Sequence, residues 1–160
     1  MFCQWMKLRI CAKAYMKKAK DRWWKDPKRN MPPKKEIKFF KLDEFDSPDQ
    51  PGSGKKHMNM NFVQRLDDAR ELSGVPFKIT SGFRSQKHHD YLTKKGYKTS
   101  ATSEHLKGNA ADIETNDSNT RYKILKSLMD VGFNRFGIGK TFIHVDCSTD
   151  KSQGVVWNYY

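Results

Sequence analysis

Two histidines and one aspartate are spaced so that they could hold a metal ion. His105 precedes Asp112 by seven residues, and Gly108 between them would let the backbone turn tightly. His144 lies far downstream, within the apolar residues 142–147. Two imidazoles and one carboxylate can bind zinc and leave a fourth position for water. Zinc polarises a carbonyl and lowers the pKa of a bound water to about 7, which is what amide hydrolysis at neutral pH needs.

The alternation of side chains along a strand predicts how these residues could meet. Residues 110–114 and 142–147 both read as strands. In the second, His144 and Asp146 would share one face while the apolar residues between them face the core. If the two strands are neighbours, Asp112 and His144 lie on the same face of the sheet. The alternative is that the two histidines are independent: one lies at the surface, and the other has its hydrogen bonds satisfied within its strand.

Charge and proline content divide the chain into two parts. Residues 1–41 hold 14 of the 31 Lys and Arg residues but only 3 of the 18 Asp and Glu residues, so they carry +11 of the net charge of +13. Three prolines between positions 27 and 33 break any helix there. We therefore expect a basic N-terminal extension and linker over residues 1–36 and a domain over residues 37–160. The extension could contact an anionic polymer, nucleic acid or lipid, or be a solvated tail.

The sequence also bears on disulfides, membranes and export. Three cysteines, two of them in the extension, are a poor disulfide framework, and Cys147 is expected to be a small core residue. No apolar run is long enough to cross a membrane, and the N-terminus lacks the apolar stretch of a signal peptide. We expect a monomer without a transmembrane segment or a signal peptide.

Helices are expected where apolar residues recur at helical spacing, and strands where they alternate. The order of these elements predicts an α+β fold, with helices packed on one side of a small antiparallel sheet. The helices are expected over residues 59 or 61 to 74, 86–95, and 117 or 118 to 132, and the strands over 37–42, 77–81, 110–114, 136–139, 142–147 and 155–160, with a loop over 46–54.

Four motifs, in the same order, resemble those of the zinc D-Ala-D-Ala carboxypeptidase family, whose fold is shared with the hedgehog signalling domain. The resemblance runs from about residue 37 to residue 160. The motifs are Phe-Asp-Ser-Pro-Asp-x-Pro-Gly-Ser-Gly at 45–54, as at the start of a phage- and bacterial-type subgroup, Ser-Gly-Phe-Arg-Ser at 81–85, Ser-x-His-x-x-Gly-x-Ala-x-Asp at 103–112, and Phe-Ile-His-Val-Asp at 142–146.

The resemblance implies a peptidoglycan peptidase with one zinc ion. It puts His105, Asp112 and His144 on the ligand positions of the family. Arg84 falls on the arginine that pairs with the terminal carboxylate of the substrate, a role that suits its planar guanidinium. Ser103 falls on a serine near the substrate. The alternatives are that Arg84 is a surface residue in a salt bridge and that Ser103 is a residue of a turn.

One departure from the family concerns the general base. Well-studied members carry an acidic residue or a histidine two or three positions before the last ligand, where residues 141–142 are threonine and phenylalanine here. Asp146 lies two residues after His144, a form that also occurs in family members regarded as wall endopeptidases. We propose Asp146 as general base or as the partner that orients His144, with a structural carboxylate as the alternative. Glu104 and Glu114 are less favoured substitutes.

The leading hypothesis is a zinc metallopeptidase that hydrolyses peptide bonds in peptidoglycan stem peptides, as a D-Ala-D-Ala carboxypeptidase or a related endopeptidase. The alternative is a non-catalytic, zinc-stabilised module that binds the cell wall or belongs to a phage particle, which the missing upstream acid supports. A third hypothesis is nucleic-acid binding through the extension. The sequence does not fix where the protein acts; the hypothesis is a phage-encoded protein that acts at the bacterial cell wall.

Overall fold

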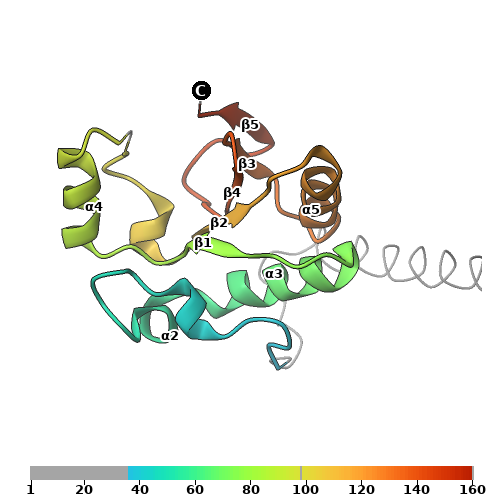
Figure 1. Ribbon diagram of the computed structural model, residues 1–160, viewed down its shortest axis with the longest axis horizontal. Coiled ribbons are helices and arrows are strands. Elements are labelled where there is room, and N and C mark those ends of the chain that lie inside the picture. Colours follow the sequence, from blue (N-terminus) through green and yellow to red (C-terminus); the bar gives the residue numbers. More distant parts are fainter. Residues whose placement is uncertain (1–35, 98, 160) are drawn as a thin grey trace, which may run out of the picture.

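The structure, a computed structural model, describes residues 36–97 and 99–159. The division between an extension and a domain near residue 36 therefore stays a prediction, because residues 1–35 lie outside the described residues. A five-stranded sheet stands at the centre, with α4 and α5 at opposite ends of the molecule (Figure 1). The α+β fold class is confirmed. Among the described residues, no helix is long and apolar enough to cross a bilayer.

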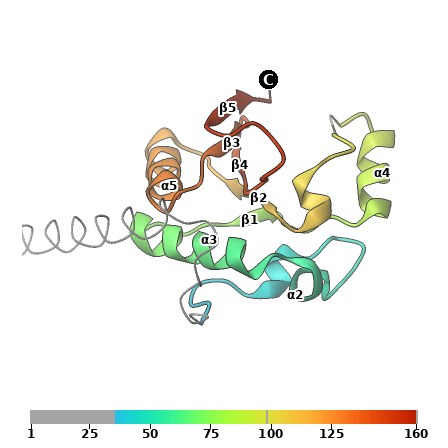
Figure 2. The same cartoon turned by 180° about the vertical axis from the view of Figure 1, so that it is seen from behind.

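Two helices cover one face of the sheet, and the view from behind shows them on the same side (Figure 2). α3 spans Met60–Ser73 and begins at Asn59, whose side chain accepts hydrogen bonds from the first turn. It ends at Gly74, which adopts the left-handed conformation with φ 66°. α5 spans Ser118–Asp130, and the side chain of Asp117 accepts a hydrogen bond from the first turn at 2.8 Å. Both helices were expected at these positions.

The strand order is β1-β2-β4-β3-β5, and the first four strands are antiparallel to their neighbours. β5 pairs parallel to β3, so the expectation of a fully antiparallel sheet is wrong at this edge. Both edges of β4 are taken by β2 and β3, so β5 cannot pair with the strand that precedes it and lies beyond β3. The strands span Ile79–Ser81 (β1), Ala110–Glu114 (β2), Arg135–Ile138 (β3), Phe142–Asp146 (β4) and Val155–Asn158 (β5).

Residues 37–42 do not form the expected strand. The backbone N–H groups of Lys38 and Phe39 donate to the carboxylate of Asp67 on α3, at 3.1 and 2.8 Å, and so are not available to a neighbouring strand. The 3-10 helix η1 follows at Leu42–Phe45. The expected loop over 46–54 runs into the short helix α2, Ser53–His57.

The core lies between the two large helices and one face of the sheet. Ile113, Ile143 and Val145 are fully buried on that face, as the alternation predicted. Cys147 packs against the core, and burial raises the pKa of its thiol to about 11. The other face of the sheet carries the polar residues of β2 and β4, which form the site described next.

Candidate active site

The structure brings His105, Asp112 and His144 together. Asp112 and His144 are opposite each other in the β2–β4 register, and Oδ1 of Asp112 lies 2.8 Å from Nδ1 of His144. Nε2 of His105 lies 3.2 Å from Nδ1 of His144 and 3.4 Å from Oδ1 of Asp112. One donor atom from each residue can be chosen so that all three lie within 4.8 Å of one another. The register explains this arrangement, because paired residues of adjacent strands project to the same face.

The stretch 81–85 orients His105. The carbonyl oxygen of Gly82 lies 2.7 Å from Nδ1 of His105, so this nitrogen donates and Nε2 is left to face the cluster. The backbone N–H of Arg84 donates to the carbonyl of His105 at 3.1 Å. A Cβ at position 82 would lie 2.5 Å from Cα of Phe45, so only glycine lets the backbone at 82 pack this closely against the backbone of Phe45.

His105 itself lies in the 3-10 helix η2, Glu104–Lys107, and Gly108 ends that helix. Gly108 adopts a left-handed conformation with φ 69°, and a Cβ there would lie 2.1 Å from the carbonyl oxygen of His57. The turn at Gly108 leads directly into β2, which carries Asp112. The sequence-based expectation that this glycine turns the backbone is therefore confirmed.

Asp146 orients His144 from the side opposite to Asp112. Its Oδ2 lies 3.3 Å from Nε2 of His144, which leaves Nδ1 of the ring facing the cluster. Its Oδ1 accepts from Nε of Arg135 at 2.7 Å and from the backbone N–H of Ser148 at 2.9 Å. Burial raises the pKa of Asp146, but the hydrogen bonds from His144 and Arg135 outweigh it and lower the pKa to about 2.

The electrostatics of the cluster favour a cation. Burial lowers the pKa of His144, but Asp112 and Asp146 on its two sides outweigh this effect and raise it to about 9. Burial likewise raises the pKa of Asp112, and the two histidines hold it well below its usual value. Two nitrogen donors and one anionic oxygen, with the second nitrogen of each ring held by an acceptor, fit a zinc ion.

Arg84 and Ser103 line the same cavity as the three cluster residues. Nη2 of Arg84 donates to Oγ of Ser81 at 3.3 Å, and its buried Nε has no hydrogen-bond partner among the described residues. Burial lowers the pKa of Arg84, while the charge of Asp112 opposes the shift. Arg84 therefore keeps donors that a ligand in the cavity could satisfy.

The cavity has a volume of about 810 Å³. One side is formed by Leu92 of α4 and by the loop after that helix, and the other by residues of β5. α4 spans Gln86–Lys94 and begins at Ser85, whose side chain caps it. α4 and β5, which contribute to its two sides, stand well apart in Figure 1.

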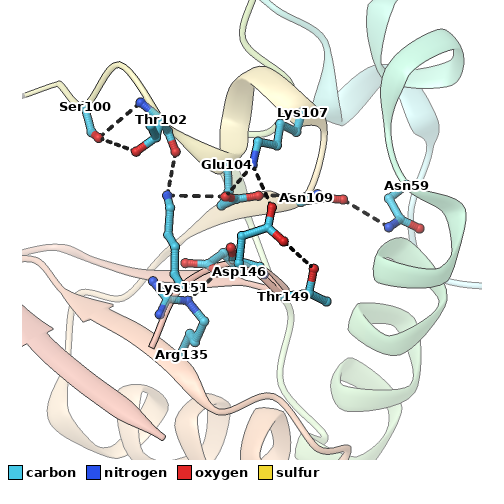
Figure 3. Close-up of polar contacts among 12 residues, drawn as sticks. Asn59, Ser100, Thr102, Glu104, Lys107, Asn109, Arg135, Asp146, Thr149 and Lys151 are labelled. Carbon is cyan, nitrogen blue, oxygen red and sulfur yellow. Dashed lines mark hydrogen bonds and ion pairs between the residues drawn. The ribbon is translucent and has the colours of Figure 1, made fainter. Parts of the chain in front are cut away.

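Sequence reasoning considered Glu104 only as a less favoured general base and missed the residues that bind it in the polar wall of the cavity (Figure 3). Glu104 is buried, and its Oε1 lies 3.2 Å from Nζ of Lys107 and 3.3 Å from Nζ of Lys151. Its Oε2 accepts from Nδ2 of Asn109 at 3.3 Å. Lys151 also donates to the carbonyl of Thr102 and so ties the β4–β5 connection to the loop before η2. No local pattern signals the contacts of Lys151, because its partners Glu104 and Thr102 are far from it in the chain.

Trp157 and Tyr159 were also missed. Both line the cavity, and the ring of Trp157 lies 5.6 Å from that of His144 between centroids. The guanidinium of Arg135 lies over the indole at 5.4 Å. Their place depends on the parallel pairing of β5, which the sequence did not indicate.

Comparisons with known proteins identify a family for the sequence and a similar fold. The sequence matches the Peptidase M15 family over residues 40–146, about two thirds of the chain. The crystal structure of the Serratia marcescens L-Ala D-Glu endopeptidase ChiX is similar, with a TM-score of 0.50 and 19% sequence identity. That likeness covers 59% of this chain and 84% of the other, and at this identity it shows a shared fold. None of the curated proteins matches the chain.

Proposed function

The chain belongs to the Peptidase M15 family, and on that premise we propose that it is a zinc-dependent peptidase acting on the stem peptides of peptidoglycan. One observation carries this proposal. His105, Asp112 and His144 each direct a donor atom to a common point, while Gly82 and Asp146 hold the second nitrogen of the two rings. When bound there, zinc would polarise the scissile carbonyl and lower the pKa of a water to about 7.

Asp146 is better suited to orient His144 than to act as general base. Its two oxygens already accept hydrogen bonds from Arg135, His144 and the backbone of Ser148. Its pKa of about 2 makes it a weak proton acceptor near neutral pH. Of the two roles considered for this residue, the geometry supports the positioning role.

Arg84 is proposed to bind a carboxylate of the substrate. Its guanidinium borders the cavity and its Nε is unpartnered among the described residues, so a carboxylate would satisfy a buried donor. Ser103, on the same wall, is proposed to contact the substrate.

Cleavage within a peptide is favoured over removal of a terminal residue. The cavity of about 810 Å³ is at the large end of the range for small-molecule sites, and its lining comes from α4 on one side and β5 on the other. That extent leaves room for peptide on both sides of the scissile bond. The similar structure from Serratia marcescens is described as an L-Ala D-Glu endopeptidase, which agrees with this choice.

The test is digestion of purified muropeptides, with the products identified by mass spectrometry. The zinc-loaded protein should release internal fragments of the stem peptide. His105→Ala should lose both zinc and hydrolysis, whereas His88→Ala, which alters a histidine of α4 outside the cavity, should retain both. Hydrolysis by zinc-free His105→Ala would refute the site.

A second candidate function is a non-catalytic module that binds the cell wall. It is supported by the absence of an acid at residues 141–142 and by the engagement of Asp146 in hydrogen bonds. Zinc-loaded protein that sediments with peptidoglycan but leaves muropeptides intact would establish this function instead.

The setting is also proposed: the wall of a bacterium, with residues 1–36 contacting its anionic polymers. Sedimentation with purified wall should then weaken when residues 1–36 are deleted and when salt is raised. Unchanged sedimentation would refute a role for the extension.

A further inference from the structure

Tyr159 lies over the sheet next to the metal cluster. Its backbone N–H donates to the carbonyl of Ile138 at 3.0 Å, which continues the pairing of β5 with β3. A Cβ at Gly137 would lie 2.4 Å from Cε2 of Tyr159 and 2.8 Å from the indole of Trp157. The two rings therefore fill the space above Gly137, whose partner in the β3–β4 register is His144. The glycine is what allows an aromatic wall at this position.

Contacts with three other rings hold the ring of Tyr159. Its centroid lies 5.3 Å from that of Phe142, 6.2 Å from that of Trp157 and 6.2 Å from that of His144. The plane of the His144 ring is inclined to it by 70°, an edge-to-face arrangement. A side chain packed in this way presents its hydroxyl in a restricted direction.

The polar end of Tyr159 shares the cavity of the cluster. Tyr159 lines that cavity together with Asp112, Asp146 and Arg84. The other charged groups on this wall form ion pairs within the protein: Arg135 pairs with Asp146, and Lys151 pairs with Glu104. The hydroxyl oxygen of Tyr159 accepts from the indole N–H of Trp157, which leaves its own proton as a neutral donor that these ion pairs do not use.

We propose that the hydroxyl of Tyr159 donates a hydrogen bond to the oxyanion that forms when water adds to the substrate carbonyl. This inference rests on the proposed peptidase function. As the carbon–oxygen bond to water forms, the π electron pair of the carbonyl moves onto its oxygen. Tyr159 stabilises that charge and keeps its proton, so no group is transferred to the protein. A phenol is protonated at neutral pH, because its ordinary pKa is about 10.

The kinetic test is Tyr159→Phe, which retains the ring and its packing and removes only the hydroxyl. We expect kcat to fall about 10²-fold, with KM changed by no more than about twofold. Zinc content and thermal unfolding should be those of the wild type. The matched control is Tyr122→Phe on the exposed surface of α5, which should be unchanged. A variant with wild-type kcat would overturn the inference, as would one that loses zinc or stability.

A second measurement does not depend on turnover. A phosphinate dipeptide, whose tetrahedral oxygens resemble the oxyanion, is titrated into the zinc-loaded proteins by calorimetry. Tyr159→Phe should bind it at least about 10-fold more weakly than the wild type and Tyr122→Phe do. Equal binding by all three, with a wild type that cleaves muropeptides, would overturn the role of Tyr159 alone. A wild type that neither binds the phosphinate nor cleaves would overturn the proposed function and this inference together.

Discussion

Arg135 and Asp146 form a buried ion pair, with Nε of the arginine 2.7 Å from Oδ1 of the aspartate. The other oxygen of Asp146 faces His144, so the pair connects β3 to a cluster residue of β4. An acid held between two donors is well placed to fix a ring and poorly placed to take a proton. This relationship predicts how the protein should behave when Asp146 is altered.

Asp146→Asn should weaken zinc binding about 10- to 100-fold, because the partner that orients His144 is changed. Hydrolysis should return largely to the wild-type rate when zinc is saturating. Competition with a chelator gives the zinc affinity, and assays over a range of zinc concentrations give the rate. Unchanged zinc affinity with a loss of about 10²-fold or more in kcat would indicate a general base instead. Asp130→Asn, on the surface of α5, is the control.

Arg84→Lys should lower kcat/KM about 10- to 100-fold for substrates with a carboxylate near the cleaved bond, because lysine cannot make a paired contact. Zinc affinity and unfolding should be unchanged. The matched control is a substrate whose carboxylate is converted to an amide. The variant and the wild type should cleave it at similar rates, and an equal loss on both substrates would contradict carboxylate binding.

Zinc uptake at pH 7.5 should release about one proton from His144, in addition to the proton lost by water bound to the ion. The pKa of His144 is raised to about 9 in the metal-free protein, so its ring is charged at that pH and must lose a proton before it can bind an ion. Titration calorimetry in buffers of different ionisation enthalpy counts the protons. The number should be smaller well above pH 9, where the ring of His144 is already neutral and contributes no proton. Release of no proton at pH 7.5 would contradict the charged state of the ring.

The stability of the metal-free protein should fall as pH rises from about 6.5 to beyond 9. The pKa of His144 is about 9 when folded and near 6.5 when unfolded, so the folded state binds its proton more tightly. That stabilisation is fully present below the unfolded pKa and is lost as pH rises through the folded pKa. Denaturant unfolding at several pH values measures it. His144→Gln should lack this pH dependence, and the same slope in that variant would assign the effect to another group.

Gly108→Ala should destabilise the protein more than Gly74→Ala. Both glycines have φ values near +70°, where a non-glycine residue costs about 1–2 kcal/mol. A Cβ at Gly74 meets open space, whereas one at Gly108 would meet the carbonyl of His57 at 2.1 Å. Denaturant unfolding should give a difference of at least about 1 kcal/mol between the two variants. Zinc affinity should fall only in Gly108→Ala, because the turn at Gly108 positions His105. An equal loss of zinc affinity in Gly74→Ala would contradict this role of the turn.

The part of the site that local rules govern could be predicted from the sequence. The alternation in residues 142–147 placed His144 and Asp146 on one face, and the structure has them there. The ends of α3 and α5 followed from capping side chains and from the glycines beyond them. These features depend on a few consecutive residues, so they can be predicted from the sequence alone.

The rest depends on contacts between distant segments. The wrong strand at 37–42 arose because Asp67, on a helix, binds the backbone there. The parallel pairing of β5 follows from which sheet edge is still free, and a local pattern does not report that. Trp157 and Tyr159 could therefore not be assigned to the site in advance.

The pairing of Asp112 with His144 has a consequence for misfolding. Slipping β2 by one residue against β4 would turn Asp112 toward the interior and take its carboxylate out of reach of both imidazoles. A mispaired sheet would then be unable to take up the ion, so an incorrectly refolded molecule would be inert. Metal content could thus serve as a measure of how faithfully a preparation has assembled its strands.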